Sequence, residues 1–117
     1  MPSPFRTAIY AAVFPTGGKL STELYIGGGD AVANESLYRW LLERRDDVEA
    51  KFGEPLSWQE LPGRQACRIA AYGVGDVTRA DEYDHYIDWF FDAGDRLRQA
   101  FDGLAEEYAH LSGQHEG

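Results

Sequence analysis

The alternation of apolar and polar positions predicts a β-hairpin near the start of the chain. The segment Lys19 to Ile26 has the period of two of a strand that buries one face, with inward positions at Leu20, Thr22, Leu24 and Ile26. The run before it, Phe5 to Phe14, is rich in the aromatic and β-branched residues that favour strands. Pro15-Thr16-Gly17-Gly18 separates the two runs with turn-forming residues, so we expect the first hairpin here.

A second hairpin is predicted later in the chain. Leu56 to Leu61 and Gln65 to Tyr72 have the composition of strands, and Pro62-Gly63 between them has that of a turn. The pleat of the second of these strands would place Cys67, Ile69 and Ala71 on one face and Arg68 and Tyr72 on the other.

One helix is expected between the two hairpins. It begins after Gly27-Gly28-Gly29, where Asp30 or Asn34 can cap the first amides, and its apolar positions recur at helical spacing to about Phe52. Gly53 is placed to end the helix in a left-handed conformation, and Pro55 prevents its resumption.

The last helix is predicted to begin near Asp81, after a loop from Gly73 to Asp76, and it has a heptad pattern. Its apolar positions follow one another in alternating steps of four and three: Tyr83, Ile87, Phe90, Gly94, Leu97, Phe101, Leu104, Tyr108 and Leu111. A straight helix over this span is roughly 45 Å long, whereas a compact domain of this length is about 30 Å across. Either the helix breaks near Gly94 or Gly103 and folds back, or its end packs on another chain.

The order ββαββα predicts an α+β fold with a four-stranded, mainly antiparallel sheet, two helices on one face and a long C-terminal helix. We expect a single domain over residues 1–111 and a polar, disordered tail over residues 112–117. The seam of the last helix is the predicted interface with another chain, through Tyr83, Ile87, Phe90, Leu97, Phe101, Leu104 and Tyr108.

Composition favours a cytoplasmic globular protein. A chain of 117 residues, of which 44% are hydrophobic, can form a core without disulfides or metals. Cys67 is the single cysteine, which suits a reducing compartment. There is no apolar run of about 18 residues, so we expect no membrane span, and the first residues lack the pattern of a secretory signal.

The net charge is −9, from 11 basic and 20 acidic residues, and it disfavours direct binding to nucleic acid. Arg39, Arg44 and Arg45 alternate with acidic residues, as in a solvated helix face. A basic partner, or a role as an acidic decoy of nucleic acid, stays open.

The motifs that suggest catalysis or cofactor binding have simpler explanations. Glu49-Ala50-Lys51 matches part of a nuclease metal signature but lies at the end of a predicted helix, not on a strand. The triple glycine belongs to no phosphate-binding motif. The three histidines have no ligand spacing, and Cys67 has apolar neighbours on its own face. We therefore expect no cofactor, no metal site and no catalytic residue from these motifs.

Arg68 is the remaining candidate, because a charge in the middle of a strand needs a partner. Either it forms a cross-strand pair with Glu23 or Glu60, or it projects into a cleft as an anchor for an anionic ligand. In the second case Arg68, Glu23 and Glu60 would converge beside a pocket, and the domain would bind a small ligand or act as a metal-dependent enzyme.

Four segments in combination resemble a bacterial family, the domain-of-unknown-function family 4268, over about Phe5 to Phe101. They are Glu23-Leu24-Tyr25-Ile26-Gly27-Gly28-Gly29-Asp30, Phe52-Gly53-Glu54-Pro55-Leu56-Ser57-Trp58, Arg68-Ile69-Ala70-Ala71-Tyr72, and Asp88-Trp89 followed by Arg96, Arg98 and Phe101. The resemblance implies a domain that often forms the C-terminal part of larger proteins with a nuclease-like N-terminal part, in settings that suggest defence or DNA processing. It implies no catalytic residues.

The chain departs from the family pattern in two places. Family members usually have a further helix and strand before the segment that matches Phe5, and many carry a histidine where this chain has Ile87. Without that strand, the first hairpin would keep an open edge, which is a site for pairing with another chain.

These observations favour a non-catalytic protein-interaction domain, either a homodimer or an accessory to another chain, such as one of a nuclease or defence system. The alternative is the small-ligand or enzyme domain built around Arg68.

Overall fold

The computed structural model describes residues 5, 7–13, 19–61, 66–75 and 79–116, and their main chain forms two hairpins and four helices. The elements follow the order β1 (Ala8–Val13), β2 (Lys19–Ile26), α1 (Ala31–Leu42), α2 (Arg45–Phe52), β3 (Ser57–Leu61), β4 (Ala66–Val74), a short 3₁₀ turn η1 (Ala80–Glu82), α3 (Tyr83–Ala100) and α4 (Leu104–Glu116).

The four strands form one antiparallel sheet in the order β1-β2-β4-β3, which confirms the predicted α+β class. Both predicted hairpins are present, because β1 pairs with β2 and β3 pairs with β4. The turns predicted at Pro15-Thr16-Gly17-Gly18 and Pro62-Gly63 lie outside the described residues. The two hairpins join through β2 and β4, which are therefore the central strands.

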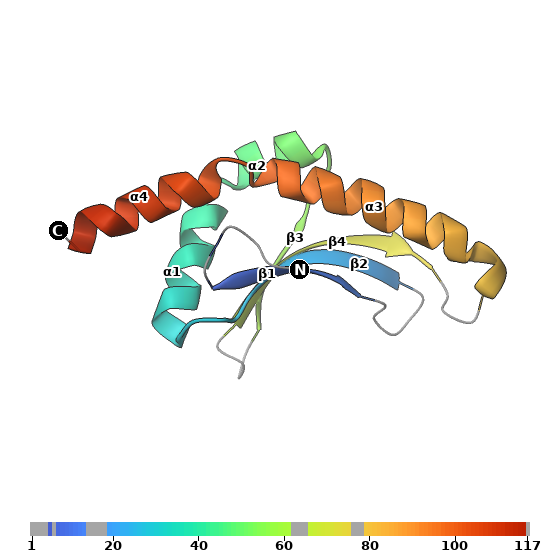
Figure 1. The fold of residues 1–117 in the computed structure, drawn as a ribbon, viewed down its shortest axis with the longest axis horizontal. Helices are drawn as coiled ribbons and strands as arrows, with labels where there is room; N and C mark the ends of the chain where they lie inside the picture. Colours follow the sequence, from blue (N-terminus) through green and yellow to red (C-terminus); the bar gives the residue numbers. More distant parts are fainter. Residues whose placement is uncertain (1–4, 6, 14–18, 62–65, 76–78, 117) are drawn as a thin grey trace.

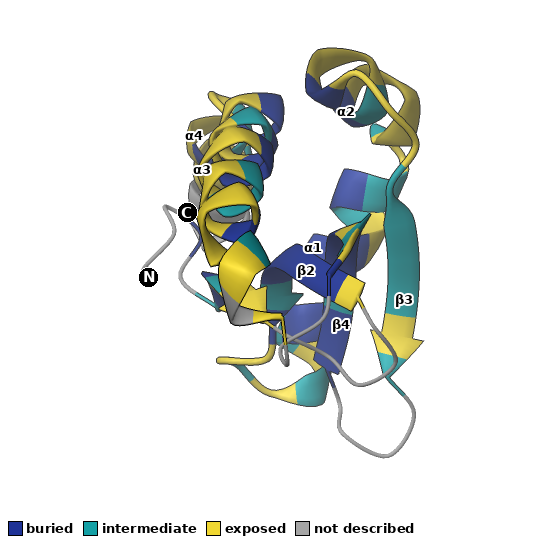
Figure 2. Ribbon diagram, turned by 90° about the vertical axis from the view of Figure 1, so that its right-hand side faces the viewer, coloured by how far each residue is buried: buried dark blue, intermediate teal, exposed yellow. Residues whose placement is uncertain are grey.

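The helices cover one face of the sheet (Figure 1). Arg98 of α3 lies over the ring of Tyr10, and Tyr38 of α1 packs against Trp58, so these strand residues face the helices. Cross-strand pairing puts Leu24 and Ile69 on the same face, and both are fully buried. The core lies between this face and the helices, and Figure 2 shows β2 and β4 buried while much of the outward side of α3 is exposed.

The helix predicted to run to Phe52 is divided into α1 and α2. Asp30 caps α1 as predicted, because its Oδ1 accepts a hydrogen bond from the Ala33 amide at 2.8 Å. The break comes at Arg44, whose guanidinium stacks on Trp40 and donates to the Trp40 carbonyl at 3.0 Å. The Arg44 amide bonds instead to the carbonyl of Leu41, which tightens the turn and redirects the chain.

The last helix is also divided, at Phe101 to Gly103. Gly103 has a φ of 80°, a left-handed conformation that ends α3. The second segment does not fold back, and Figure 1 shows α4 continuing away from α3 beyond the sheet. The molecule is accordingly elongated, at 55 × 30 × 22 Å.

The near part of α4 packs on the end of α1. Tyr108 contacts Trp40 with ring centroids 5.1 Å apart, and Glu107 lies 3.7 Å from the Arg44 guanidinium. The backbone stays helical to Glu116, where the sequence predicted a disordered tail from Ser112.

Candidate functional site

Glu23 and Arg68 meet on the face of the sheet that the helices leave uncovered. Arg68 Nε and Glu23 Oε2 are both buried and form an ion pair, although their alignment is not that of a hydrogen bond. Glu23 is only 6% exposed, and its cross-strand neighbours, Ala11 and Ala70, are small enough to leave room for the pair. Burial raises the pKa of the Glu23 carboxyl, and the Arg68 guanidinium opposes that shift. The structure thus contains one of the two cross-strand pairs that the sequence allowed.

Glu60 does not join this pair. In the register of β3 and β4, Gln59 lies opposite Arg68 and Glu60 lies opposite Cys67, so the Glu60 side chain points to the other face of the sheet. The three residues proposed to converge in a cleft are therefore separated. Cavities of about 320 to 410 Å³ in the described part of the chain are lined by other side chains.

The remaining polar groups on this open face bond to one another. Gln59 Nε2 donates to the Tyr72 hydroxyl at 2.7 Å and to Ser57 Oγ at 2.8 Å. The Lys19 ammonium lies 5.5 Å from the centre of the Tyr72 ring. These contacts join side chains of β2, β3 and β4 to one another.

Within the described residues, no group of three or more His, Cys, Asp or Glu side chains is arranged to hold a metal ion. Cys67 is buried, and burial raises the pKa of its thiol, which disfavours the reactive thiolate. Glu49, from the nuclease-like Glu49-Ala50-Lys51, accepts hydrogen bonds from the Leu56 amide at 2.7 Å and from Trp58 Nε1 at 3.1 Å. Its carboxylate therefore holds the connection from α2 to β3.

The predicted interface residues of the last helices fall into three groups. Tyr83 and Ile87 are exposed, and Phe90 is half-buried. Leu97 and Phe101 are 0% and 1% exposed and belong to the core of the chain itself. Leu104 and Tyr108 pack against that core from the outside. Leu97 and Phe101 thus pack against residues of their own chain and offer no surface to a second chain.

An apolar surface does remain on the side of α3 next to β1. Ile87 is 50% exposed and Phe91 73%, and they follow Tyr83 at successive steps of four residues, so the three share one side of the helix. Between this side of α3 and the strand β1 is a cavity of about 330 Å³ lined by Ile9, Tyr10, Ala11, Ala12, Thr22, Phe90, Gly94 and Arg98. We name the open edge of β1 together with the exposed α3 side chains Tyr83, Ile87 and Phe91 the β1–α3 surface. Ile9 and Val13 of β1 are exposed as well, but strand alternation turns them to the uncovered face of the sheet.

The heptad pattern did not identify Phe91 because it assigned the seam to Phe90. Both residues are apolar and adjacent, and the period of seven accepts only one of them. A second apolar residue beside a seam position is the signal that could have revealed a broader apolar face.

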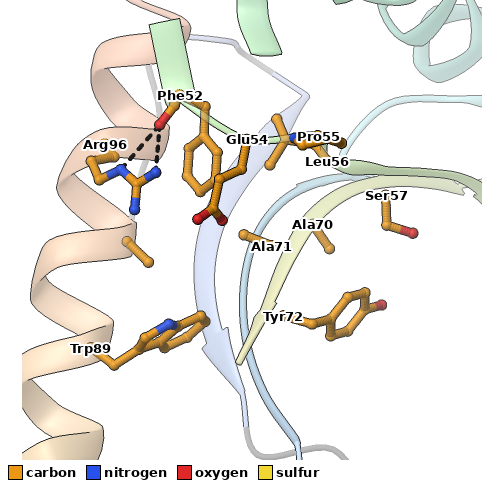
Figure 3. A pocket seen from close by; sticks show the side chains of 11 residues that line it. Phe52, Glu54, Pro55, Leu56, Ser57, Ala70, Ala71, Tyr72, Trp89 and Arg96 are labelled. Carbon is orange, nitrogen blue, oxygen red and sulfur yellow. Dashed lines mark hydrogen bonds between the residues drawn. The ribbon is translucent and has the colours of Figure 1, made fainter. Parts of the chain in front are cut away.

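A second cavity lies between α3 and the connection from α2 to β3 (Figure 3). It has a volume of about 410 Å³ and is lined by Phe52, Glu54, Pro55, Leu56, Ser57, Ala70, Ala71, Tyr72, Trp89, Ala93 and Arg96. Arg96 donates from Nε and Nη2 to the Phe52 carbonyl at 3.0 and 2.7 Å, which ties α3 to the end of α2. The segments that carry the family resemblance between Phe52 and Arg96 meet around this cavity.

No helix among the described residues is both long and apolar enough to cross a lipid bilayer. Comparison with curated proteins and comparison with solved structures found no match. The sequence model of a protein family, described as Domain of unknown function (DUF4268), matches residues 6–104 of the 117. This match covers both hairpins, α1, α2 and α3, and it stops at the first residue of α4. The chain therefore belongs to the domain-of-unknown-function family 4268.

Proposed function

We propose that this chain is a non-catalytic protein-interaction domain that associates with a second copy of itself through the β1–α3 surface. The observation that supports it most directly is the character of strand β1. β1 is an edge strand, and its six residues, Ala-Ile-Tyr-Ala-Ala-Val, include no charge, no proline and no glycine. Monomeric proteins usually protect such an edge with lysine, proline or a bulge, because open edges pair with other chains.

The neighbouring side of α3 supports the same proposal. Ile87 and Phe91 are exposed on the side of α3 next to the β1 edge, and a cavity of about 330 Å³ lies between the helix and the strand. An open strand edge beside an exposed apolar side of a helix favours a protein partner over a small ligand.

A second copy suits this surface because the surface is self-complementary. If two β1 strands pair antiparallel about a two-fold axis, the two sheets join into one, and the α3 helices lie on the same face. The apolar sides of both helices then face each other across the axis. The net charge of −9 on each copy opposes association at long range, but the strand that pairs carries no charge.

The test is the mass of the native protein in solution. Wild-type protein is expected at twice the chain mass of 13.1 kDa in native mass spectrometry and light scattering. Ile9→Lys places a charge at the strand edge, and Phe91→Glu places one on the helix side, so each should yield a folded monomer.

Val32→Lys is the matched control, because Val32 is 75% exposed on α1, outside the β1–α3 surface. It should keep the mass of the wild-type protein. A wild-type monomer at every concentration, or a dimer that survives both Ile9→Lys and Phe91→Glu, would contradict the proposal.

A further inference from the structure

The end of β4 extends beyond its neighbour β3. The two strands pair from Ser57 opposite Ala70 to Leu61 opposite Ala66, whereas β4 continues to Val74. On its other side β4 stays paired with β2 as far as Lys19 opposite Val74. Residues 71–74 are thus an ordered part of the sheet with no described strand on their outer side.

Glu49 explains why β3 begins only at Ser57. Its carboxylate accepts the Leu56 amide at 2.7 Å, so this amide bonds to α2 rather than to β4. Pro55 has no amide hydrogen to offer a neighbouring strand. The chain before Ser57 therefore leaves the sheet and rises to α2, which opens a space beside residues 71–74.

That space is the cavity of about 410 Å³, which we name the β4 groove. Trp89, Ala93 and Arg96 of α3 line one wall, and Phe52, Glu54 and Pro55 line the other, with Ala71 and Tyr72 of β4 at its base (Figure 3). Its volume is within the range of binding pockets, about 300 to 1,000 Å³.

Trp89 lies directly against the backbone of β4. A Cβ atom added to Gly73 would lie 2.6 Å from Cε2 of the indole, so glycine at this position is what lets the ring approach the strand. Trp89 is half-buried and borders the groove, where an aromatic face can hold a cation or an aliphatic chain.

The charges around the groove favour a basic ligand. Arg96 is the one cation among the lining residues, and it is already engaged with the Phe52 carbonyl, the Phe52 ring and Asp92. Glu54 is exposed, and Figure 3 shows its carboxylate pointing into the space between α3 and β4. None of the ion pairs in the described part of the chain involves Glu54.

We infer that the β4 groove binds an extended peptide segment of a partner protein that carries a lysine or arginine. The segment pairs with residues 71–74 of β4 as an added strand, and its basic side chain lies between Trp89 and Glu54. Main-chain hydrogen bonds supply affinity in this mode of recognition, and the pocket for one side chain supplies selectivity. The groove is separate from the β1–α3 surface, so the inference does not depend on the proposed dimer.

The first experiment selects ligands from a phage-displayed library of random linear heptapeptides on the immobilised full chain. Recovered peptides should be enriched in lysine or arginine at one position and in β-branched residues beside it. Selection on a Glu54→Lys variant should lose this enrichment. Recovery of acidic peptides, recovery of the same peptides on both proteins, or no recovery above background would overturn the inference.

The second experiment measures the affinity of the most enriched peptide, labelled with fluorescein, by fluorescence anisotropy. Glu54→Gln should weaken binding about tenfold, the loss expected when a charged contact is removed. Glu106→Gln, an exposed glutamate on α4, makes the same change of net charge away from the groove and should bind as the wild type does.

Methylation of the peptide amides, one at a time, tests for strand addition. Alternate amides of an added strand point toward β4, so loss of binding should recur with a period of two. Uniform tolerance of methylation would show that the peptide does not pair with β4. Native mass spectrometry of the same samples reports the dimer independently, so either proposal can fail without the other.

Discussion

The two outer edges of the sheet differ in length, charge and cover. β3 has five residues, includes the exposed Glu60, and is held to the helices through Trp58, which packs on Tyr38 and bonds to Glu49. β1 has six residues without a charge and borders an exposed apolar side of α3. Because charge is a usual defence of a strand edge, this difference supports the proposal that a second chain pairs with β1 and not with β3.

The connection before β3 adds a second contrast. The hydrogen bond that Glu49 accepts from the Leu56 amide keeps the chain before Ser57 out of the sheet. Residues 71–74 of β4 therefore lie beside an aromatic and acidic groove and not beside β3. The β1 edge offers an uncharged strand of six residues, whereas the β4 groove offers four strand residues beside one polar pocket. The first arrangement suits a folded surface of the same kind, and the second suits a single extended segment.

The largest expected effect separates the inner and outer sides of α3. Leu97→Asp puts a charge into the core and should cost more than about 4 kcal/mol of unfolding free energy, enough to unfold a domain of this size. Phe91→Asp, on the exposed side, should change the unfolding free energy of the monomer by about 0.5 kcal/mol or less. Urea denaturation followed by circular dichroism measures both. A folded, monomeric Leu97→Asp protein would show that Leu97 belongs to the interface between chains, as the heptad pattern predicted, and not to the core.

A smaller effect tests what holds the β3 edge. Glu49→Gln removes charge-assisted hydrogen bonds to the Leu56 amide and to Trp58, and should cost about 1 to 3 kcal/mol of unfolding free energy. These hydrogen bonds hold the pKa of Glu49 below its ordinary value of 4.5. The stabilisation is therefore present above pH 4.5 and is lost as the pH falls through the lower value in the folded state.

Urea denaturation of wild type and Glu49→Gln between pH 7 and pH 3 checks this prediction. The difference between the two proteins should shrink toward the acid end, while Glu106→Gln should follow the wild type closely. A difference that is constant with pH would show that the Glu49 charge does not hold the edge.

The smallest expected effect concerns Glu23, between the two edges. Burial raises the pKa of Glu23 above its ordinary value of 4.5, with Arg68 opposing the rise. The folded state thus binds this proton more tightly than the unfolded state does, so the contribution of Glu23 is most favourable below pH 4.5 and declines as the pH rises through the raised value.

Glu23→Gln should remove this decline, by about 1 kcal/mol or less, because the Gln side chain has no charge to bury and Arg68 already offsets much of that cost in the wild type. Denaturation curves of the two proteins from pH 4 to pH 8 give the comparison. If the wild type instead becomes more stable than Glu23→Gln as the pH rises above 4.5, the ion pair outweighs the cost of burying the carboxylate.

Local features of the fold were predictable because they depend on residues close together in sequence. Asp30 and Gly53 mark the ends of helical segments through hydrogen bonds and backbone geometry within a few residues of each. The strand β2 has the predicted bounds because its alternation and the flanking glycines are local signals, although Ser21 and Glu23 on its other face are buried too. The division at Arg44 was not predicted, since its cause is a side-chain contact with Trp40 that no periodic pattern contains.

The candidate sites were predictable only in part, because they depend on strand register and on which elements meet. The pattern of residues allowed Arg68 to pair with Glu23 or Glu60. The register of β3 against β4 turns Glu60 to the other face of the sheet, so Arg68 pairs with Glu23. The heptad pattern located an apolar side of the last helix correctly. Only the packing of α3 on the sheet decided that Leu97 is buried and that Phe91 is exposed.

The sequence by itself determined the class of the protein: two hairpins, helical segments after each, an acidic surface and a family likeness. These follow from short-range patterns of hydrophobicity, turn residues and charge, which act within a few positions along the chain. Only the tertiary structure decided where the proposed binding surfaces lie. The uncharged edge of β1 beside α3, and the groove that Glu49 opens beside β4, each arise where segments distant in sequence come together. Such surfaces depend on the relative positions of those segments, which no local pattern specifies.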